Sequence, residues 1–444
     1  MSLAAAALLN EQCWCIGTDL PGLHDALDTL LARASVAEPI RSSHPHLFAG
    51  VPLFIADSQR QRIADVVAAI QRVVALPGWQ AAAVADAPAI AAHAPGNAGA
   101  FLGVDFHLQL LDGASDPAPQ LIEINTNPGG ALLNVLLGRA QQACCAPVAE
   151  AFPDLQNFDA AEARLAELFL AEWRAAGRVG QPRHLVVCDE APQAQYLYPE
   201  FLLYRELLGR AGVRVSIADP RTLQWQGGQL LHEGAVVDMV YNRLTDFALA
   251  ADHLAPLRAA WLADAIVLTP HPRSHALFAS KRNLVHLSDA AWLAGIGVDA
   301  ATSALLASAV PPTGLVRRDD ADALWAERRR LFFKPLDGFG GRGAYRGDKL
   351  TRGTFESILD GGYVAQRIVP PTERVIAQGA ADGRAWGEGD TALKVDLRAY
   401  SYDGEVLLLA ARLYRGQTTN FRTEGGGFAP VLRAAEGCGC TGTA

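Results

Sequence analysis

Segments of alternating apolar and polar residues predict strands in the first third of the chain. Residues 103–108 alternate in this way, and residues 121–125 form a second short apolar segment. A turn-rich stretch around Asp112 and Gly113 separates the two, so they are predicted to pair as a hairpin. The Pro-Gly-Gly sequence at 128–130 then ends the second strand.

The predicted hairpin gathers oxygen ligands on one face. Successive side chains on a strand point to opposite faces, so Glu123 and Asn125 share a face, and pairing brings Asp105 near Glu123. Mg²⁺ prefers carboxylate and carbonyl oxygens and keeps positions open for water and phosphate. Asp105, Glu123 and Asn125 are therefore predicted to bind a metal. His107 shares the face of Asp105 and could be a base or a hydrogen-bonded structural histidine.

A different pattern begins at residue 184, where short apolar strands alternate with a helical segment. This alternation predicts a small parallel α/β unit. Arg243 follows the end of one strand, where an arginine could bind substrate; a salt-bridged surface arginine is the alternative. The predicted strands are 185–188, 213–217, 236–241 and 265–268, with a helix at 200–208 and a hairpin turn at Gly227 and Gly228.

Two segments have the apolar spacing of amphipathic helices. Residues 157–177 carry large apolar residues four apart and end at a glycine, which predicts a helix that bridges domains. Residues 58–74 begin with Ser58 and Gln61, which are spaced as a capping box. The apolar stripe that follows predicts a core helix.

A lysine and a glycine-rich loop follow one another in the last third of the chain. The apolar segment 331–335 predicts a strand that carries Lys334, and four of the six residues 338–343 are glycines. Glycine lets backbone amides approach an anion closely and adopt positive φ, while the lysine supplies charge for phosphates. Taken alone, such a loop could equally be a flexible turn. The glycines are Gly338, Gly340, Gly341 and Gly343.

Two further segments favour phosphate binding by this loop. Lys281 opens a predicted helix at 280–287 and offers a second positive charge. The strand predicted at 363–369 could present backbone groups to an adenine edge. The residues concerned are Gln366, Arg367 and Ile368.

Together these motifs resemble those of the ATP-grasp enzymes, in particular D-alanine:D-alanine ligases, glutamate ligases and glutathione synthetases. The similar features are Gly-Val-Asp paired with Glu-Ile-Asn-Thr-Asn-Pro-Gly, a lysine, a second lysine with a glycine loop, and a hinge strand with Gln. Asp-x-Arg at 396–398, Ala-x-Arg at 410–412 and an asparagine before a Gly-Gly turn resemble the core strands of glutamate ligases and glutathione synthetases.

The order of these motifs differs from that of most such enzymes. Their hairpin usually lies near the C-terminal end, whereas here it lies in the first third. Joining the end of the chain to residue 100 restores the usual order, as in eukaryotic glutathione synthetases. The resemblance therefore implies an α/β protein with a circularly permuted ATP-grasp domain and a Rossmann-like pre-grasp α/β domain. Surface termini make such a permutation physically reasonable.

The resemblance also implies a reaction. ATP and Mg²⁺ would be required, with two ions expected. A substrate carboxylate would attack the γ-phosphate to give an acyl phosphate, and an amine would then form an amide and release phosphate. Arg398 and Arg412 would hold the acyl phosphate, because their planar forks match phosphate and carboxylate; structural salt bridges are the alternative. Asn420 would contact substrate.

Other functions of the same fold remain open. A kinase would transfer phosphate to a hydroxyl, an acyl-thiol synthetase would use a thiol, and a scaffold would bind nucleotide without catalysis. The sequence does not identify the small acid, amino acid or peptide, nor the amine, because variable loops build those pockets. Residues 377–389 could be a lid, a substrate loop or a disordered insertion.

Composition excludes several classes of partner. The net charge of -9 and the absence of a basic patch with interleaved aromatics argue against nucleic-acid binding. No apolar run reaches the roughly 18 residues that span a bilayer, and the first residues lack the basic region of a signal peptide. A cytoplasmic location is therefore expected.

The seven cysteines do not form a recognisable framework. Their odd number and close spacing fit neither secreted disulfides nor structural zinc, so free thiols are predicted. Cys438 and Cys440 could bind a soft metal or be incidental to a disordered end.

The predicted organisation has six parts. They are a mixed helical region (1–100), the permuted magnesium hairpin segment (101–150), a bridging helix (151–180), the pre-grasp α/β domain (181–280), the ATP-grasp domain (281–432) and a disordered tail (433–444).

Overall fold

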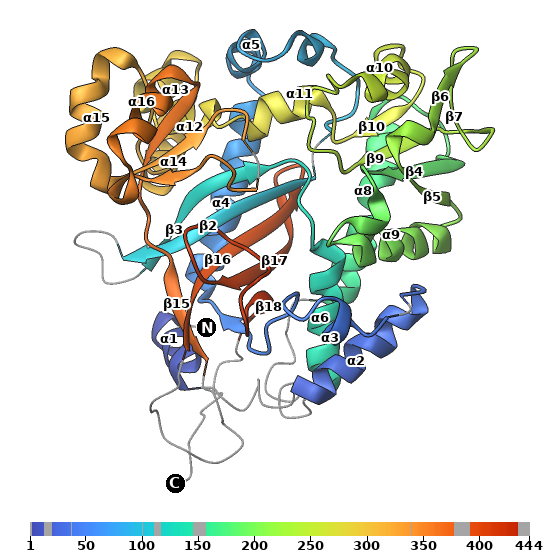
Figure 1. Ribbon diagram of the computed structural model, residues 1–444, viewed down its shortest axis with the longest axis horizontal. Coiled ribbons are helices and arrows are strands. Elements are labelled where there is room, and N and C mark those ends of the chain that lie inside the picture. Colours follow the sequence, from blue (N-terminus) through green and yellow to red (C-terminus); the bar gives the residue numbers. More distant parts are fainter. Residues whose placement is uncertain are drawn as a thin grey trace.

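A central sheet lies between two smaller sheets in the computed structural model of the protein (Figure 1). The structure describes residues 2–12, 20–36, 38–99, 101–110, 117–144, 157–338, 340–376 and 391–433. The loop 377–389, the tail from 434 and all cysteine side chains except that of Cys188 lie outside this description. Cys188 is a buried free thiol.

The central sheet has seven strands drawn from both ends of the chain. Its order is β1 (Leu53–Phe54), β18 (Gly427–Leu432), β17 (Glu405–Tyr414), β16 (Thr391–Tyr402), β2 (Leu102–Leu110) and β3 (Pro117–Asn125). β15 (Thr372–Ile376) pairs with the first residues of β16, and β2 pairs with its later residues.

The predicted hairpin is present, as β2 and β3. Asp105 lies opposite Glu123 across the hairpin and opposite Arg398 of β16 on its other side. The apolar residues that alternate with Asp105 point to the other face, where Val104 and Phe106 join the main core. The helix α4 (Asp57–Val74) covers that face, so the opposite face is left for polar side chains.

A small antiparallel sheet lies beside the central one. It contains β11 (Thr313–Leu315), β14 (Tyr363–Arg367), β12 (Leu331–Pro335) and β13 (Tyr345–Arg346). Phe333 of β12 packs on Phe355 of α16 (Arg352–Asp360), which anchors the strand that carries Lys334. The neighbouring helices are α12 (Arg282–Leu287), α13 (Ala290–Gly295), α14 (Ala300–Ala309) and α15 (Ala321–Glu327).

The third unit is parallel, as the alternation of strands and helices predicts. Its strand order is β10 (Val267–Thr269), β9 (Met239–Asn242), β4 (His184–Cys188) and β5 (Arg214–Ala218). β9 begins later than predicted, because Ala235 and Val236 form β8 and pair with β7 (Gln229–His232). The hairpin at Gly227 and Gly228 joins β6 (Leu223–Gln226) to β7. The helices α9 (Tyr198–Arg210) and α10 (Ala255–Leu262) belong to this region.

The first hundred residues are mainly helical, but they also contribute to the central sheet. β1 pairs in parallel with β18, which the sequence did not indicate. The predicted capping pair at Ser58 and Gln61 is wrong: the N-cap of α4 is Ala56, two residues earlier than Ser58, and Gln59 accepts the Ala56 N–H at 3.0 Å. The other helices are α1 (Leu3–Gln12), α2 (Leu20–Arg33), α3 (Ile40–Ser43) and α5 (Pro77–Ala85). No helix in the described residues is both long and apolar enough to cross a bilayer.

Two helices, α6 (Ala131–Cys144) and α8 (Phe158–Ala175), follow the hairpin. Glu172 of α8 is fully buried and accepts hydrogen bonds from Asn97 Nδ2 at 2.8 Å, from Gly99 N at 2.7 Å and from Tyr402 Oη at 2.9 Å. Burial raises the pKa of this carboxyl above its ordinary value. Glu172 thereby joins α8 to β16 and to the segment that enters β2.

We expect Glu172→Leu to lower the free energy of unfolding by about 2 to 4 kcal/mol, because two buried donors and one partly buried donor lose their acceptor. Glu172→Gln should lose less, since the amide oxygen can still accept. Urea unfolding followed by circular dichroism measures both. The control is Glu167→Leu on the exposed side of α8, which should change stability by no more than about 0.5 kcal/mol. Equal losses for Glu172→Leu and this control would contradict the assignment.

Candidate functional site

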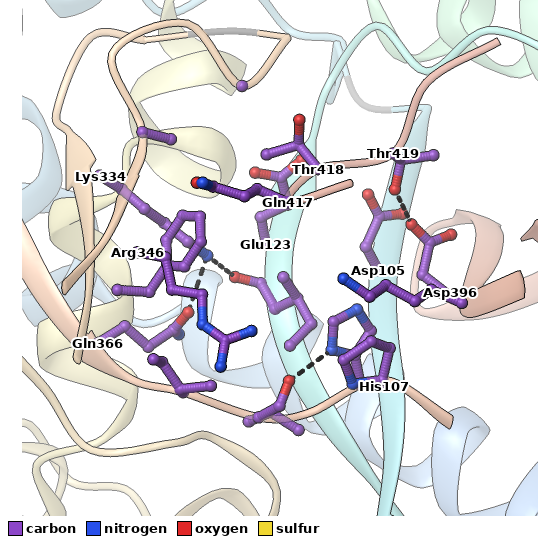
Figure 2. Close-up of a pocket in the computed structure, with 18 of the residues that line it drawn as sticks. Asp105, His107, Glu123, Lys334, Arg346, Gln366, Asp396, Gln417, Thr418 and Thr419 are labelled. Atoms are coloured by element: carbon purple, nitrogen blue, oxygen red, sulfur yellow. Dashed lines mark hydrogen bonds between the residues drawn. The ribbon is translucent and has the colours of Figure 1, made fainter. Parts of the chain in front are cut away.

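A cavity of about 440 Å³ lies between the polar face of the central sheet and the small antiparallel sheet (Figure 2). Its volume is in the usual range for small-molecule sites. The central sheet supplies Asp105, His107, Glu123, Asn125, Lys394, Asp396, Arg398 and Arg412. The antiparallel sheet and its loops supply Phe332, Lys334, Gly338, Gly340, Gly341 and residues 366–371. Lys281, Glu373 and residues 417–419 also line the cavity.

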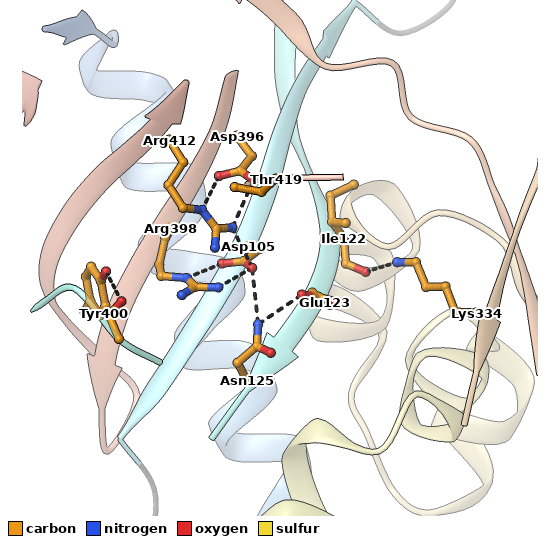
Figure 3. Close-up of polar contacts among 11 residues, drawn as sticks. Asp105, Ile122, Glu123, Asn125, Lys334, Asp396, Arg398, Tyr400, Arg412 and Thr419 are labelled. Carbon is orange, nitrogen blue, oxygen red and sulfur yellow. Dashed lines mark hydrogen bonds and ion pairs between the residues drawn. The ribbon is translucent and has the colours of Figure 1, made fainter. Parts of the chain in front are cut away.

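Two arginines clamp Asp105 on the cavity floor (Figure 3). Arg398 donates to both oxygens of Asp105 at 2.7 Å, from Nε and from one Nη atom. Arg412 donates to Asp105 at 2.8 Å and also to Asp396 at 2.6 and 3.0 Å. Thr419 donates a further hydrogen bond to Asp396. The result is a buried network of two carboxylates and two guanidinium groups.

The network keeps Asp105 ionised. Burial acts against its negative charge, but Arg398 and Arg412 together outweigh burial and lower the pKa of Asp105 below its ordinary value. The same contacts raise the pKa of Arg412 despite its burial. The opposite charges hold one another in fixed positions, so the floor of the cavity is preorganised.

Glu123 and Asn125 stand beside this network and are only half buried. Asn125 Nδ2 donates to Asp105 and to Glu123, both at 3.2 Å. Burial and the neighbouring charge of Asp105 act against the Glu123 carboxylate, but Lys281, followed by Lys334 and the hydrogen bond from Asn125, outweighs them and lowers the pKa of Glu123. Glu123 is therefore an ionised oxygen donor that faces the cavity.

These residues fit a hard divalent cation that completes its shell with water and phosphate. No group of three or more His, Cys, Asp or Glu gathers in a ligand arrangement within the described residues. Glu123 and the amide oxygen of Asn125 remain suitable, because Mg²⁺ is commonly held by one or two protein ligands. Asp105 already accepts four hydrogen bonds, so it is better placed to orient its neighbours than to bind metal directly.

Two lysines enter the cavity from the opposite side. Lys334 Nζ donates to the Ile122 carbonyl at 2.7 Å and to Gln366 Oε1 at 2.8 Å. Burial is the main influence on this ammonium and lowers its pKa to about 8, against the attraction of Glu123. Lys281 precedes α12 and donates to the Gly338 carbonyl. A polyanion between these lysines would relieve the cost of burying their charge.

The glycine loop lies over the lysines. Gly340 and Gly341 have φ of 58° and 71°, which favours glycine. A Cβ on Gly341 would lie 3.0 Å from Thr418 Oγ1, so glycine also allows the loop to approach the segment 417–419. Gly343, predicted as part of the same site, is not in the cavity lining.

The hinge differs in detail from the prediction. Gln366, Arg367 and Ile368 do line the cavity. However, the N–H groups of Arg367 and Ile368 already donate to the carbonyls of Pro312 and Arg330, at 2.9 and 2.8 Å. They are therefore not available to an adenine edge. The amide oxygen of Gln366 accepts from Lys334, whereas its buried amide nitrogen has no partner within the described residues.

His107 links the floor to the hinge. Its Nδ1 lies 2.8 Å from the Val369 carbonyl, and the ring lines the cavity. Burial is the largest influence and lowers the pKa of His107, although Asp396 opposes it. Of the two sequence interpretations, the hydrogen-bonded histidine is the arrangement observed.

Arg243 lies outside the cavity. It follows β9 and is buried, and it donates to the Pro128 carbonyl and to Tyr241 Oη, both at 3.1 Å. The surface salt bridge considered from sequence is therefore wrong. Glu200 lies beside it and accepts the Gly130 N–H at 2.8 Å, at the start of α6. These contacts fix the Pro-Gly-Gly turn that follows Asn125 in sequence.

Asn420 also lies outside the cavity lining. Its amide donates to the Arg415 carbonyl at 2.7 Å, and its oxygen accepts the Arg422 N–H at 3.0 Å. In the structure it shapes the loop whose neighbours, Thr418 and Thr419, reach the cavity.

Sequence reasoning missed several lining residues. Asp396 was noted only as part of the Asp-x-Arg motif, without a role in the site. Lys394 and Asp396 share a strand face with Arg398, so period-2 alternation would have placed both in the site. Thr418 and Thr419 carry no comparable signal, because a loop has no periodicity. Glu373 of β15 was missed because that strand was not predicted.

Comparisons with known proteins support the fold. No family model matches the sequence, and no curated protein matches it significantly. The structure is similar to that of a glutathione synthetase-like effector from Globodera pallida in its apoform, with a TM-score of 0.55 and 12% identity over 92% of this chain and 97% of that chain. A "Putative gamma-glutamylcysteine synthetase" from Methylobacillus flagellatus gives a TM-score of 0.44 and 13% identity over 83% and 86%, which is too low to support an argument. The chain thus has a mixed α/β fold similar to that of a glutathione synthetase-like protein.

The lowered pKa of Lys334 predicts proton uptake by the protein if a polyanion such as Mg-ATP is bound beside this residue. At about pH 8.5 much of the free protein carries an uncharged amine at this position, and a triphosphate favours the charged form. Affinity should therefore fall as pH rises from about 7 to about 9. Calorimetric titration in buffers of different ionisation enthalpy measures the protons taken up.

Lys334→Arg is the matched variant, because arginine stays protonated throughout this range. It should remove most of the proton uptake at about pH 8.5. Uptake that is unchanged in Lys334→Arg would assign it to another group.

Proposed function

We propose that the protein is an ATP- and Mg²⁺-dependent ligase that joins a carboxylate to an amine through an acyl phosphate. The observation that carries this proposal is the position of Glu123 and Asn125, on a hairpin beside β16 and across one cavity from Lys281 and Lys334. Phosphoryl transfer needs mainly positioning and charge neutralisation, and these residues offer both.

The sheet order supports a circularly permuted ATP-grasp arrangement. β2 and β15 follow one another along the same edge of β16, although Asp105 of β2 precedes Arg398 of β16 by 293 residues. A hairpin that followed β18 in sequence could occupy the same place. The parallel sheet, whose strand order reverses between β4 and β9, would be the Rossmann-like pre-grasp domain.

The two lysines, Glu123 and Asn125 have defined parts in the proposal. Lys281 and Lys334 bind the phosphates, together with the glycine loop. Glu123 and Asn125 would hold Mg²⁺, which when bound neutralises charge on the transferring phosphoryl group. No nucleophilic side chain is needed, because the substrate carboxylate attacks the γ-phosphate and ADP leaves.

Arg398 and Arg412 retain donors for the acyl phosphate. Each uses Nε and one Nη atom in the buried network, and no bond to the remaining Nη1 occurs within the described residues. Both residues line the cavity. A side chain held on one edge and free on the other can stabilise the acyl phosphate with little reorganisation.

The acid and the amine would approach from the side of the Pro-Gly-Gly turn. Arg243 lies at the carboxyl end of β9, where the strand order reverses, which is where α/β sheets commonly bind ligands. Its bond to the Pro128 carbonyl ties this position to the metal strand. We propose substrate contact by Arg243 and a shaping role for Asn420.

A screen for ADP release identifies the reaction. Amino acids, short peptides and polyamines would be tested with Mg-ATP, alone and in pairs. A ligase requires an acid and an amine together and releases free phosphate. A stable phosphorylated product would favour a kinase, dependence on a thiol would favour an acyl-thiol synthetase, and binding without turnover would favour a scaffold.

With a substrate pair in hand, Glu123→Gln should lose at least about two orders of magnitude in turnover, because the amide is nearly isosteric but brings no charge to the metal. Circular dichroism checks that the variant folds.

The matched control is Glu373→Gln, an acidic residue at the exposed side of the same cavity. It should keep most of the activity. A folded Glu123→Gln protein with more than about a tenth of wild-type turnover would remove Glu123 from the metal site.

A further inference from the structure

His107 has no part in the ligase chemistry, although its ring lines the cavity. Figure 2 shows the ring on the floor strand with its bond to Val369. A carbonyl oxygen can only accept a hydrogen bond, so the hydrogen must lie on Nδ1 of His107. This bond therefore fixes the tautomer of the ring.

The second ring nitrogen is left as an acceptor. A neutral imidazole with hydrogen on Nδ1 presents a lone pair at Nε2. No bond to Nε2 is present in the part of the chain that the structure describes, and the atom is not buried away from the cavity. The nearby groups that would bind phosphate, such as Lys334 and Arg398, are hydrogen-bond donors. Nε2 therefore suits a ligand group that donates.

The position of the ring along the cavity indicates which group that is. Asp105 and Glu123 mark the phosphate end, and residues 366–369 mark the hinge end, where the base would lie. His107 lies two residues from Asp105 on β2 and is bonded to the last of the hinge residues. A nucleotide that spans both ends places its sugar over the floor between them.

We propose that His107 Nε2 accepts a hydrogen bond from a ribose hydroxyl of the bound nucleotide and so favours ribonucleotides over deoxyribonucleotides. This inference rests on the proposed function. The amino group of the base is the competing donor, but a base at the hinge end would lie against residues 366–369, whereas His107 belongs to the floor.

Two variants of His107 test the Nε2 acceptor separately from the Nδ1 hydrogen bond to the Val369 carbonyl. Asn in place of His107 keeps an amide N–H that can reach the Val369 carbonyl, but it is too short to offer an acceptor at the position of Nε2. Gln is long enough to offer its amide oxygen there. Gln109→Leu is the control, because Gln109 is on the same strand but outside the cavity lining.

Calorimetric titration at about pH 8, where an ordinary histidine is neutral, would compare four Mg²⁺ complexes: ATP, 2′-deoxy-ATP, 3′-deoxy-ATP and ITP. We expect wild type and Gln109→Leu to bind ATP about 2- to 10-fold more tightly than one of the two deoxy nucleotides, the range for one hydrogen bond. In His107→Asn, binding of ATP should weaken by a similar factor and this preference should disappear. His107→Gln should restore part of it.

Two results would overturn the ribose contact. In the first, wild type does not prefer ATP over either deoxy nucleotide, or His107→Asn shows the same preference as wild type. In the second, His107→Asn loses only the discrimination between ATP and ITP and keeps its preference over the deoxy nucleotides. That result would place the acceptor against the base. If wild type binds no Mg-ATP at all, the proposed function itself fails; if it binds Mg-ATP with either of the two results above, only this inference fails.

Discussion

The clamp of Asp105 by Arg398 and Arg412 is the interaction on which the rest of the site depends. These residues are separated by about 300 positions in sequence, yet they form a buried ion network between adjacent strands. Removing one member of such a network leaves an uncompensated buried charge, which costs about 3 to 5 kcal/mol. The network therefore fixes the register of the hairpin against β16, and with it the position of Glu123.

The same charges prepare the cavity for an anion. The two carboxylates and two guanidinium groups of the network are balanced. Beside them the lining holds three lysines, Lys281, Lys334 and Lys394, and two carboxylates, those of Glu123 and Glu373. The Nη1 groups of Arg398 and Arg412, which the network does not use, add hydrogen-bond donors. Their guanidinium charges are already held in place by the network. A nucleotide phosphate thus meets groups that are held before it arrives, which is the condition for electrostatic stabilisation of transferring charge.

Sequence patterns predicted the elements whose formation depends on residues close together in the chain. Alternation and a turn predicted the hairpin, and apolar spacing predicted α4 and α8, because burial of one face is a local property of sequence. Alternation also indicated that Asp105, Glu123 and Asn125 share a face. The clamp of Asp105 could not be predicted, because it depends on the register of two distant strands. The hydrogen-bond partners of the hinge and of Asn420 could not be predicted from the sequence either. The hinge N–H groups donate to carbonyls within the protein, and the Asn420 amide donates within its own loop.

The most direct test is a crystal structure of the protein with Mn²⁺ and a non-hydrolysable ATP analogue. The anomalous signal of Mn²⁺ locates the metal independently of the protein contacts. The account predicts a peak within about 2.5 Å of the Glu123 carboxylate and the Asn125 amide oxygen, with the phosphates against Lys281 and Lys334 and the base at the hinge. A metal peak away from Glu123, or a nucleotide bound outside this cavity, would contradict it.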